Sequence, residues 1–192
     1  MKPDTFERLF HKCQEKDFLH SNNIGNEIPF YIIPYPPKEE RSVSLQVGMV
    51  SKRLAEENIA VLHLDLFDIC IDLLKEQDLL EPIFDLEKEE DPAYFLDAFD
   101  SAINDTVFTA FIQKKIQQIN PDVVFIEGVG KVYPFKKIHP LISNMHDKTE
   151  GKPIVFFYPG IYDGNTFRLF GLHDDNDGEL FKTNYYRAYN LA

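Results

Sequence analysis

The sequence has few cysteines and no long apolar run. Its two cysteines, Cys13 and Cys70, form no CxxC pair and no metal-ligand spacing, so each is interpreted as a packed thiol. The N-terminus lacks the apolar core of a signal peptide, and no run of residues approaches transmembrane length. We therefore expect a cytoplasmic protein that does not enter a membrane.

Positive charge is also scarce. Lys and Arg number 20 against 32 Asp and Glu, which gives a formal net charge of -12 and a pI of about 4.9. A surface this acidic repels phosphate backbones, so we expect no nonspecific binding to DNA or RNA, and basic protein partners are favoured instead. The charged stretch 76–91 is interpreted as a solvated helix edge or loop.

Apolar residues, by contrast, are plentiful and regularly spaced. Hydrophobic residues make up 44% and aromatic residues 14% of the chain, enough for the core of one domain spanning residues 1–192. Apolar runs predict strands at 29–35, 59–66, 122–127, 153–158 and 166–170. Helical spacing predicts helices at 3–19, 42–57, 67–74, 92–118 and 139–145, with Asp4 and Ser42 as N-terminal caps. This alternation predicts a three-layer α/β domain with a mainly parallel central sheet.

Two strand ends are the most informative part of the chain. The apolar runs 123–126 and 154–158 lead into turns rich in Gly or Pro at 127–135 and 159–164. Open α/β sheets bind ligands at the carboxyl ends of their strands, so these turns, with the aromatic segment 184–189, form a candidate crevice or interface. Its candidate residues are Glu127, Gly128, Gly130, Tyr133, Pro134, His139, Tyr158, Pro159, Gly160, Tyr162, Tyr185, Tyr186 and Arg187. Tyr and Arg commonly anchor protein interfaces, which favours an interface here. The alternative, to which we give equal weight, is that the same rings are buried in the core.

The motifs of common enzymes are missing. The segment 36–42 contains no glycine where a phosphate loop would follow the first strand, and Gly128-Val129-Gly130 is only part of a dinucleotide fingerprint. No HxH or HExxH occurs. HxD spacing occurs twice, at His63/Asp65 and His173/Asp175; such residues would share a face of a strand, and both pairs are interpreted as core or solvated-loop residues. We therefore assign no catalytic residue, metal or cofactor. A degenerate nucleotide-binding fold without a phosphate loop, acting as a nucleotide sensor, is the alternative function, and a metal-dependent hydrolase is a weaker one.

Several unusual strings occur in an order that resembles the BrxB component of BREX bacteriophage-exclusion systems, a domain-of-unknown-function family. These strings are GNEIPF at 25–30, LDLFD at 64–68, EGVGKVYPF at 127–135 with His139, FFYPGIY at 156–162 and NYYRA at 184–188. The chain departs from the family pattern at Lys136-Lys137, where an arginine is expected.

The resemblance implies a non-catalytic adaptor in a multi-protein phage-defence assembly. Such assemblies mark host DNA by adenine methylation and block the replication of unmarked phage DNA. The implied partners are other BREX components, which include a methyltransferase, an ATPase and PglZ, a protein with an alkaline-phosphatase-like domain. The resemblance implies contact with PglZ and supplies no catalytic residue to carry over.

Overall fold

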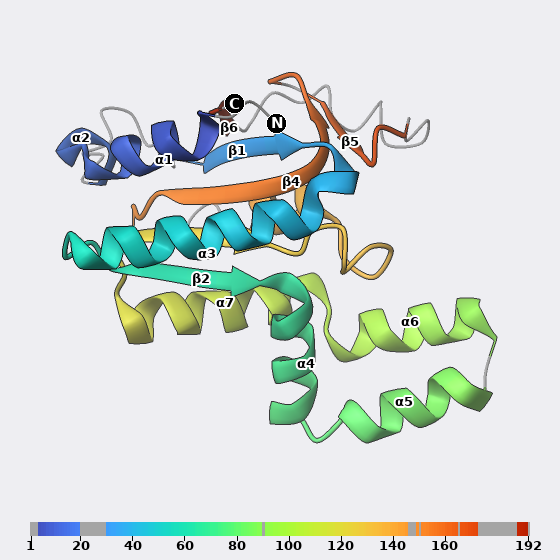
Figure 1. Cartoon of the computed structure of the whole chain (residues 1–192). Coiled ribbons are helices and arrows are strands. Elements are labelled where there is room, and N and C mark those ends of the chain that lie inside the picture. The colour runs from blue at the N-terminus through green and yellow to red at the C-terminus, as the bar shows by residue number, and fades with distance from the viewer. Residues whose placement is uncertain are drawn as a thin grey trace.

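A mainly parallel sheet of six strands forms the centre of the computed structural model (Figure 1). The structure describes residues 4–19, 30–89, 91–145, 149, 151–164, 166–172 and 188–191. Five strands follow the order β2-β3-β4-β1-β6 in parallel pairs, and β5 pairs antiparallel with β4. The strands are β1 (Phe30–Tyr35), β2 (Val61–Asp65), β3 (Val123–Glu127), β4 (Ile154–Tyr162), β5 (Phe167–Leu169) and β6 (Ala188–Asn190). The predicted α/β fold with a mainly parallel sheet is confirmed.

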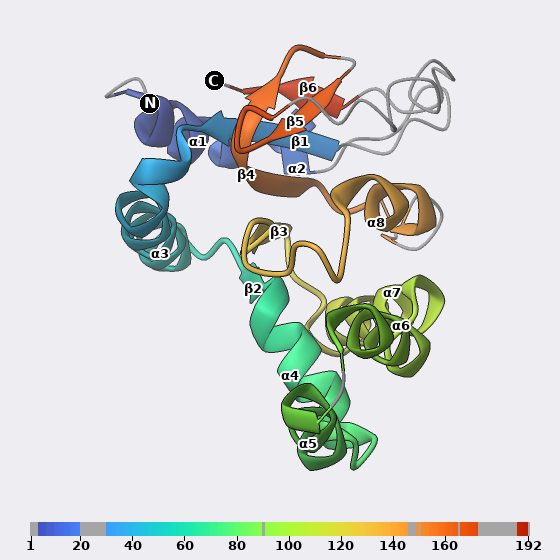
Figure 2. The ribbon, with the colours of Figure 1, turned by 90° about the vertical axis from the view of Figure 1, so that its right-hand side faces the viewer.

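Helices cover both faces of this sheet (Figure 2). The helices are α1 (Thr5–Gln14), α2 (Lys16–Leu19), α3 (Glu40–Glu56), α4 (Leu66–Glu76), α5 (Leu80–Glu89), α6 (Pro92–Ala102), α7 (Asp105–Ile119) and α8 (Ile138–Met145), with a short 3-10 turn, η1 (Pro37–Glu39), before α3. Helices α1, α2 and α3 pack against one face, around Phe125 and Phe157. α4, α7 and α8 pack against the other, around Ile126 and Phe156. Among the described residues, no helix is long and apolar enough to cross a membrane.

The two central strands explain the unbroken apolar runs in the sequence. Residues 123–126 of β3 and 154–157 of β4 have no exposed surface. Because helices cover both faces, side chains on either side of these strands enter a core, and neither side has to be polar. The predicted interior position of β3 is confirmed.

Residues 76–105 leave the sheet as a helical extension, which we call the arm. The arm links α4 to α7: α5 lies beyond the far end of α4, and α6 runs back from there towards α7 (Figures 1 and 2). Its inner side joins the core through the buried side chains of Ile83, Phe99 and Ile103. Most other arm residues are exposed or half-buried, as the interpretation of 76–91 as a solvated helix edge predicted.

Two predicted helices are each divided into two. The helix predicted at 3–19 breaks between Gln14 and Lys16, and the helix predicted at 92–118 breaks between α6 and α7. The second break follows from Asn104, whose side-chain oxygen accepts hydrogen bonds from the backbone N–H groups of residues 106 and 107 and so begins a new helix.

Asp4 occupies the predicted N-cap position of α1 but does not cap it with its side chain, and the predicted cap of α3 at Ser42 is wrong. The Asp4 carboxylate makes no capping hydrogen bond; its Oδ2 lies 3.3 Å from Arg8 Nε in an ion pair on the helix surface. Ser42 lies inside the first turn of α3, because the η1 turn has already brought the chain into a helical path before Glu40.

The turn predicted at 159–164 is largely strand. β4 continues through Pro159 and Gly160 to Tyr162, because β5 pairs with its last three residues. Gly160 permits this pairing, since a Cβ atom there would collide with the carbonyl oxygen of Arg168 on β5. β6, which the apolar pattern did not predict, pairs with Phe30–Ile32 of β1.

Candidate functional site

Polar side chains gather where three parallel strands end, on the sheet face covered by α3. Tyr35, Asp65 and Glu127 are the last residues of β1, β2 and β3, and carboxyl ends of parallel strands lie at one edge of a sheet. α3 and the turn after β3 add further members. We call this set the strand-end cluster; it consists of Tyr35, Glu40, Ser44, His63, Asp65, Glu127 and Lys131.

Glu127 lies at the centre of the cluster. Its side chain is only 8% exposed, because it continues the face of β3 that packs under α3. Its Oε1 accepts a hydrogen bond of 3.1 Å from Ser44 Oγ and lies 3.1 Å from His63 Nε2. A buried carboxylate is stable only when donors replace its lost water, and these two side chains supply them.

Asp65 joins three parts of the site. Its Oδ1 accepts a hydrogen bond of 2.9 Å from the backbone N–H of Phe67 and so caps α4, while its Oδ2 forms an ion pair with Lys131. Partial burial opposes the charged form of Lys131, yet the Asp65 carboxylate, with the charges of Glu127 and Glu40, raises the pKa of its ammonium group. Lys131 therefore stays charged and paired.

Gly128 lets the turn after β3 pass close to Asp65. Its φ is +79°, in the left-handed region that favours glycine, and a Cβ atom there would collide with Asp65 Oδ1. The glycine at this position is thus needed both for the backbone conformation and for the space beside the Asp65 carboxylate.

Tyr35 closes the cluster on the β1 side. Its phenol donates a hydrogen bond of 2.6 Å to Glu40 Oε2. Burial raises the pKa of Tyr35, and the hydrogen bond and negative charge of Glu40, with the charges of Glu127 and Asp65, raise it further. The phenol is therefore a neutral donor at physiological pH.

The cluster pairs its charges internally. Ser44 gives its hydrogen bond to Glu127 and not to His63, so the three side chains do not have the nucleophile-to-base order of a catalytic triad. Within the described ranges, no three His, Cys, Asp or Glu side chains are grouped to hold a metal ion. The arrangement braces the strand ends and gives no nucleophile an activating base.

Exposed apolar side chains lie beside the cluster. Tyr133, on the turn after β3, meets Phe170 edge to face with ring centroids 6.3 Å apart. The other exposed members come from β4 and the turn after β5. We call the set the strand-end patch; it consists of Tyr133, Ile161, Phe170 and Leu172, each at least 40% exposed.

Tyr158 and Tyr162 belong to the core. Both are buried, and their rings pack against Phe167 with centroids 5.2 and 4.5 Å away. Tyr162 also donates a hydrogen bond of 3.0 Å to the carbonyl oxygen of Gly164. These two rings hold β4 and β5 together, and Tyr133 presents its ring to solvent.

The remaining candidate residues are scattered. Gly130 lies against Pro159 and Phe170, to which an added Cβ would come within 3.0 Å. Pro134, which follows a cis peptide bond, is exposed. His139 lies half-buried in α8, on the sheet face opposite the cluster. The candidates at 185–187 (Tyr185, Tyr186 and Arg187) lie outside the described residues.

Sequence reasoning missed most of the cluster. Glu127 was a candidate, but its partners Ser44 and His63 come from α3 and β2, far away along the chain. One signal was present, since His63 and Asp65 share a strand face as their spacing predicted. Only the strand order places that face beside β3.

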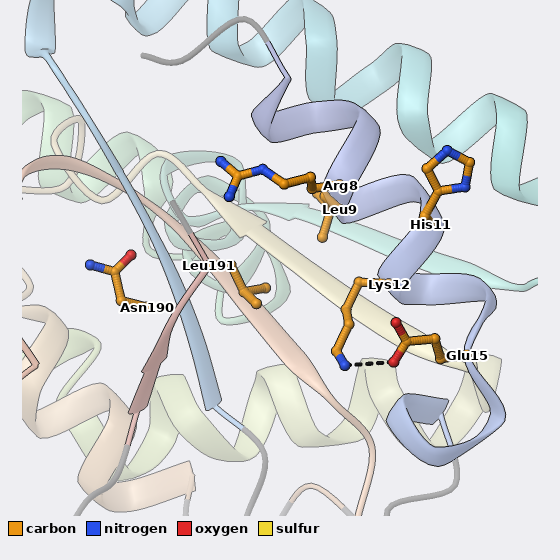
Figure 3. A pocket seen from close by; sticks show the side chains of 7 residues that line it. All are labelled: Arg8, Leu9, His11, Lys12, Glu15, Asn190 and Leu191. Carbon is orange, nitrogen blue, oxygen red and sulfur yellow. Dashed lines mark hydrogen bonds and ion pairs between the residues drawn. The ribbon is translucent and has the colours of Figure 1, made fainter.

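A hollow lies between α1 and the end of β6 (Figure 3). It measures about 410 Å³ and is lined by Arg8, Leu9, His11, Lys12, Glu15, Asn190 and Leu191. Its basic side chains have acidic or polar neighbours: Arg8 pairs with Asp4, Lys12 Nζ lies 2.6 Å from Glu15 Oε2, and His11 Nδ1 lies 3.3 Å from Gln14 Oε1. None of these lining residues is among the candidate residues predicted from the sequence.

Comparison with known proteins connects the chain to a family. The chain is 31% identical to the BREX protein BrxB of Bacillus cereus (strain H3081.97) over 193 residues, which cover 98% of the chain and 96% of that protein. It is also 31% identical to the BREX protein BrxB of Escherichia coli O9:H4 (strain HS) over 181 residues, covering 94% and 86% of the two chains. No solved structure matches. The family model described as BREX protein BrxB matches residues 62–191, and the chain therefore belongs to the BrxB family of BREX phage-defence proteins.

Proposed function

We propose that this protein is a non-catalytic adaptor of a BREX system, which supports host DNA methylation and phage restriction by holding other components together. One observation carries the proposal. At the edge of the sheet where a ligand or substrate is expected, the polar side chains are bound to one another and the apolar side chains beside them are exposed.

The internal pairing argues against catalysis. A general base must reach the proton that it removes, whereas Glu127 is buried and held by Ser44 and His63. Asp65 is likewise held by Lys131 and by the start of α4. A substrate would have to displace these contacts before either carboxylate could act.

The exposed patch favours contact with a protein. Aromatic and large aliphatic side chains that can be desolvated supply most of the binding energy of protein interfaces. The strand-end patch presents two aromatic and two aliphatic side chains, and its Tyr133 lies on the same turn as Lys131, the cation of the cluster. Family membership makes the other BREX components the partners to expect, and PglZ is the first of them to test.

The experiment compares two isoleucines of similar exposure. Ile161 of the patch is 50% exposed and Ile119, at the end of α7, is 56% exposed. We expect Ile161→Ala to weaken binding to purified PglZ about tenfold, roughly 1.4 kcal/mol, and Ile119→Ala to leave it unchanged. Isothermal titration calorimetry measures both. Binding that is the same for both variants would place the interface elsewhere, and wild-type protein that binds no BREX component would contradict the adaptor role.

A nucleotide-sensing module is the second candidate, because the cluster lies where α/β sheets bind nucleotides. We expect the purified protein neither to bind ATP in calorimetry nor to hydrolyse ATP or DNA. Hydrolysis that is lost in Glu127→Gln would instead make Glu127 a catalytic residue, and ATP binding without hydrolysis would favour the sensor.

A further inference from the structure

Most of the chain's net charge lies in the arm. Residues 76–105 contain 11 Asp and Glu residues and one lysine, Lys88, so they carry a formal charge of -10 out of the chain's -12. The other 162 residues are therefore close to neutral. The acidity of this protein is a property of one projecting segment.

The outer sides of the arm helices also expose aromatic rings. Phe84 on α5 is 40% exposed and Tyr94 on α6 is 54% exposed. Each has a carboxylate three residues away on the same helix side, Glu81 beside Phe84 and Asp97 beside Tyr94, and both carboxylates are exposed. The inner sides carry the apolar residues that join the core.

The arm is held in place by the turn that follows β3. The ring of Phe135 packs against those of Phe95 and Phe99 on α6, with centroids 5.8 and 4.3 Å away. The next residue, Lys136, has a buried side chain whose Nζ lies 2.8 Å from Asp100 Oδ1 and 3.2 Å from an oxygen of Asp105. These contacts pre-organise the outer helix sides, which reduces the entropy cost of binding.

We propose that the outer sides of α5 and α6 dock a positively charged surface of another BREX component. The charge complementarity selects this occupant, because exposed rings with carboxylates beside them fit apolar pockets bordered by Lys or Arg. Nucleic acid is repelled by the same charge. A second copy of this chain, with its own -10 arm, is repelled as well. The inference rests on the proposed adaptor role in that its partner belongs to the BREX system.

The test uses purified components of the chain's own BREX system, one at a time, with binding measured by calorimetry at 50 and 300 mM NaCl. The arm variant is Glu81→Gln with Asp97→Asn. These positions leave intact the roles of Asp85, which pairs with Lys88, and of Asp91, which caps α6. Its control is Glu56→Gln with Glu57→Gln, which changes the net charge equally at exposed positions at the end of α3.

We expect one component to bind the wild type and to bind more weakly at the higher salt concentration. The arm variant should weaken this binding about tenfold at 50 mM NaCl, and the control by less than twofold. Phe84→Ala should weaken binding about tenfold at both salt concentrations, and Ile119→Ala should leave it unchanged. Circular dichroism verifies that each variant is folded.

Other outcomes overturn the inference. If the arm variant and its control weaken binding equally, the charge acts only at long range and the arm is not a docking surface. If Ile161→Ala weakens binding and the arm variants do not, the adaptor role stands and this inference fails. If no component binds the wild type at 50 mM NaCl, both fail. If the arm variant alters the sedimentation of the isolated protein but not its binding to any BREX component, a second copy of the chain occupies the surface.

Discussion

At the scale of single residues, Lys136 shows how a charged group becomes part of the core. The chain has lysine where the family pattern led us to expect arginine, and its side chain is only 2% exposed. Its ammonium group reaches Asp100 and Asp105 at the surface, so the aliphatic stem is buried and the charge is satisfied. This contact joins the turn after β3 to the arm.

Lys136→Met should therefore destabilise the protein. The aliphatic stem is largely kept, but two charged hydrogen bonds are lost, and we expect a cost of about 1–2 kcal/mol in the free energy of unfolding. Urea unfolding followed by circular dichroism measures it. Lys137→Met is the control, because it removes the same charge from the neighbouring exposed position. Equal stability of the two variants would contradict the role of Lys136.

Gly128 permits a second prediction. Gly128 and Gly151 have nearly the same φ, +79° and +75°, but a Cβ atom at Gly128 would collide with Asp65 and one at Gly151 would meet nothing within 4 Å. Alanine at either position pays the cost of the left-handed backbone. We expect Gly128→Ala to cost about 1–3 kcal/mol more than Gly151→Ala in urea unfolding. Equal costs would mean that the space beside Asp65 is not limiting.

Residue types alone predicted part of the site. Glu127 and Gly128 were candidates because they end an apolar strand, and both lie at the strand-end cluster. The sequence did not decide whether the tyrosine rings are buried or exposed, because a ring at a strand end can pack inward or outward. Only the pairing of β5 with β4 decides it, since β5 brings Phe167 against Tyr158 and Tyr162.

At the scale of elements, local side chains decide where helices begin. Asn104 caps α7 with two hydrogen bonds of 3.1 Å, whereas Asp4 at the start of α1 makes none from its side chain. We expect Asn104→Ala to cost about 1 kcal/mol in the free energy of unfolding, and Asp4→Ala to cost clearly less because it loses only an exposed ion pair. Thermal or urea unfolding of the two variants tests this. An Asp4 variant that is the less stable one would contradict it.

Elements with long apolar runs could be predicted, and those that depend on a partner could not. β3 and β4 stand out in the sequence because both their faces are buried. β6 spans three residues and exists through its pairing with β1. The extension of β4 through Pro159-Gly160 likewise depends on β5, because the same dipeptide without a partner strand is typical of a turn.

At the scale of the whole molecule, two buried thiols should make the free energy of unfolding fall at alkaline pH. Burial raises the pKa of Cys13 and of Cys70 to about 12 each, well above the value of about 8.5 in an unfolded chain. Below that value both states hold neutral thiols and stability is unaffected. As the pH rises from about 9 to 12, only the unfolded state loses the protons, so stability should fall. Urea midpoints at pH 8 and pH 10 measure this fall.

The matched variant combines Cys13→Ala with Cys70→Ala. Its stability at pH 8 will be lower because two side chains are shortened in the core. Its further loss between pH 8 and pH 10 should be smaller than that of the wild type, by on the order of 1 kcal/mol for each thiol removed. An equal further loss would show that other groups, such as the buried phenol of Tyr35, cause the alkaline dependence.

The strand order has a consequence for synthesis of the protein. β1 precedes the other described strands along the chain, but its neighbours in the sheet are β4 and β6, which begin at Ile154 and Ala188. β2 and β3 can pair with each other earlier. The nascent chain therefore carries β1, with the apolar side chains of Ile32 and Ile33, without a strand partner while residues 36–153 are made. Until β4 has been made, this unpaired strand is open to chaperones and to aggregation.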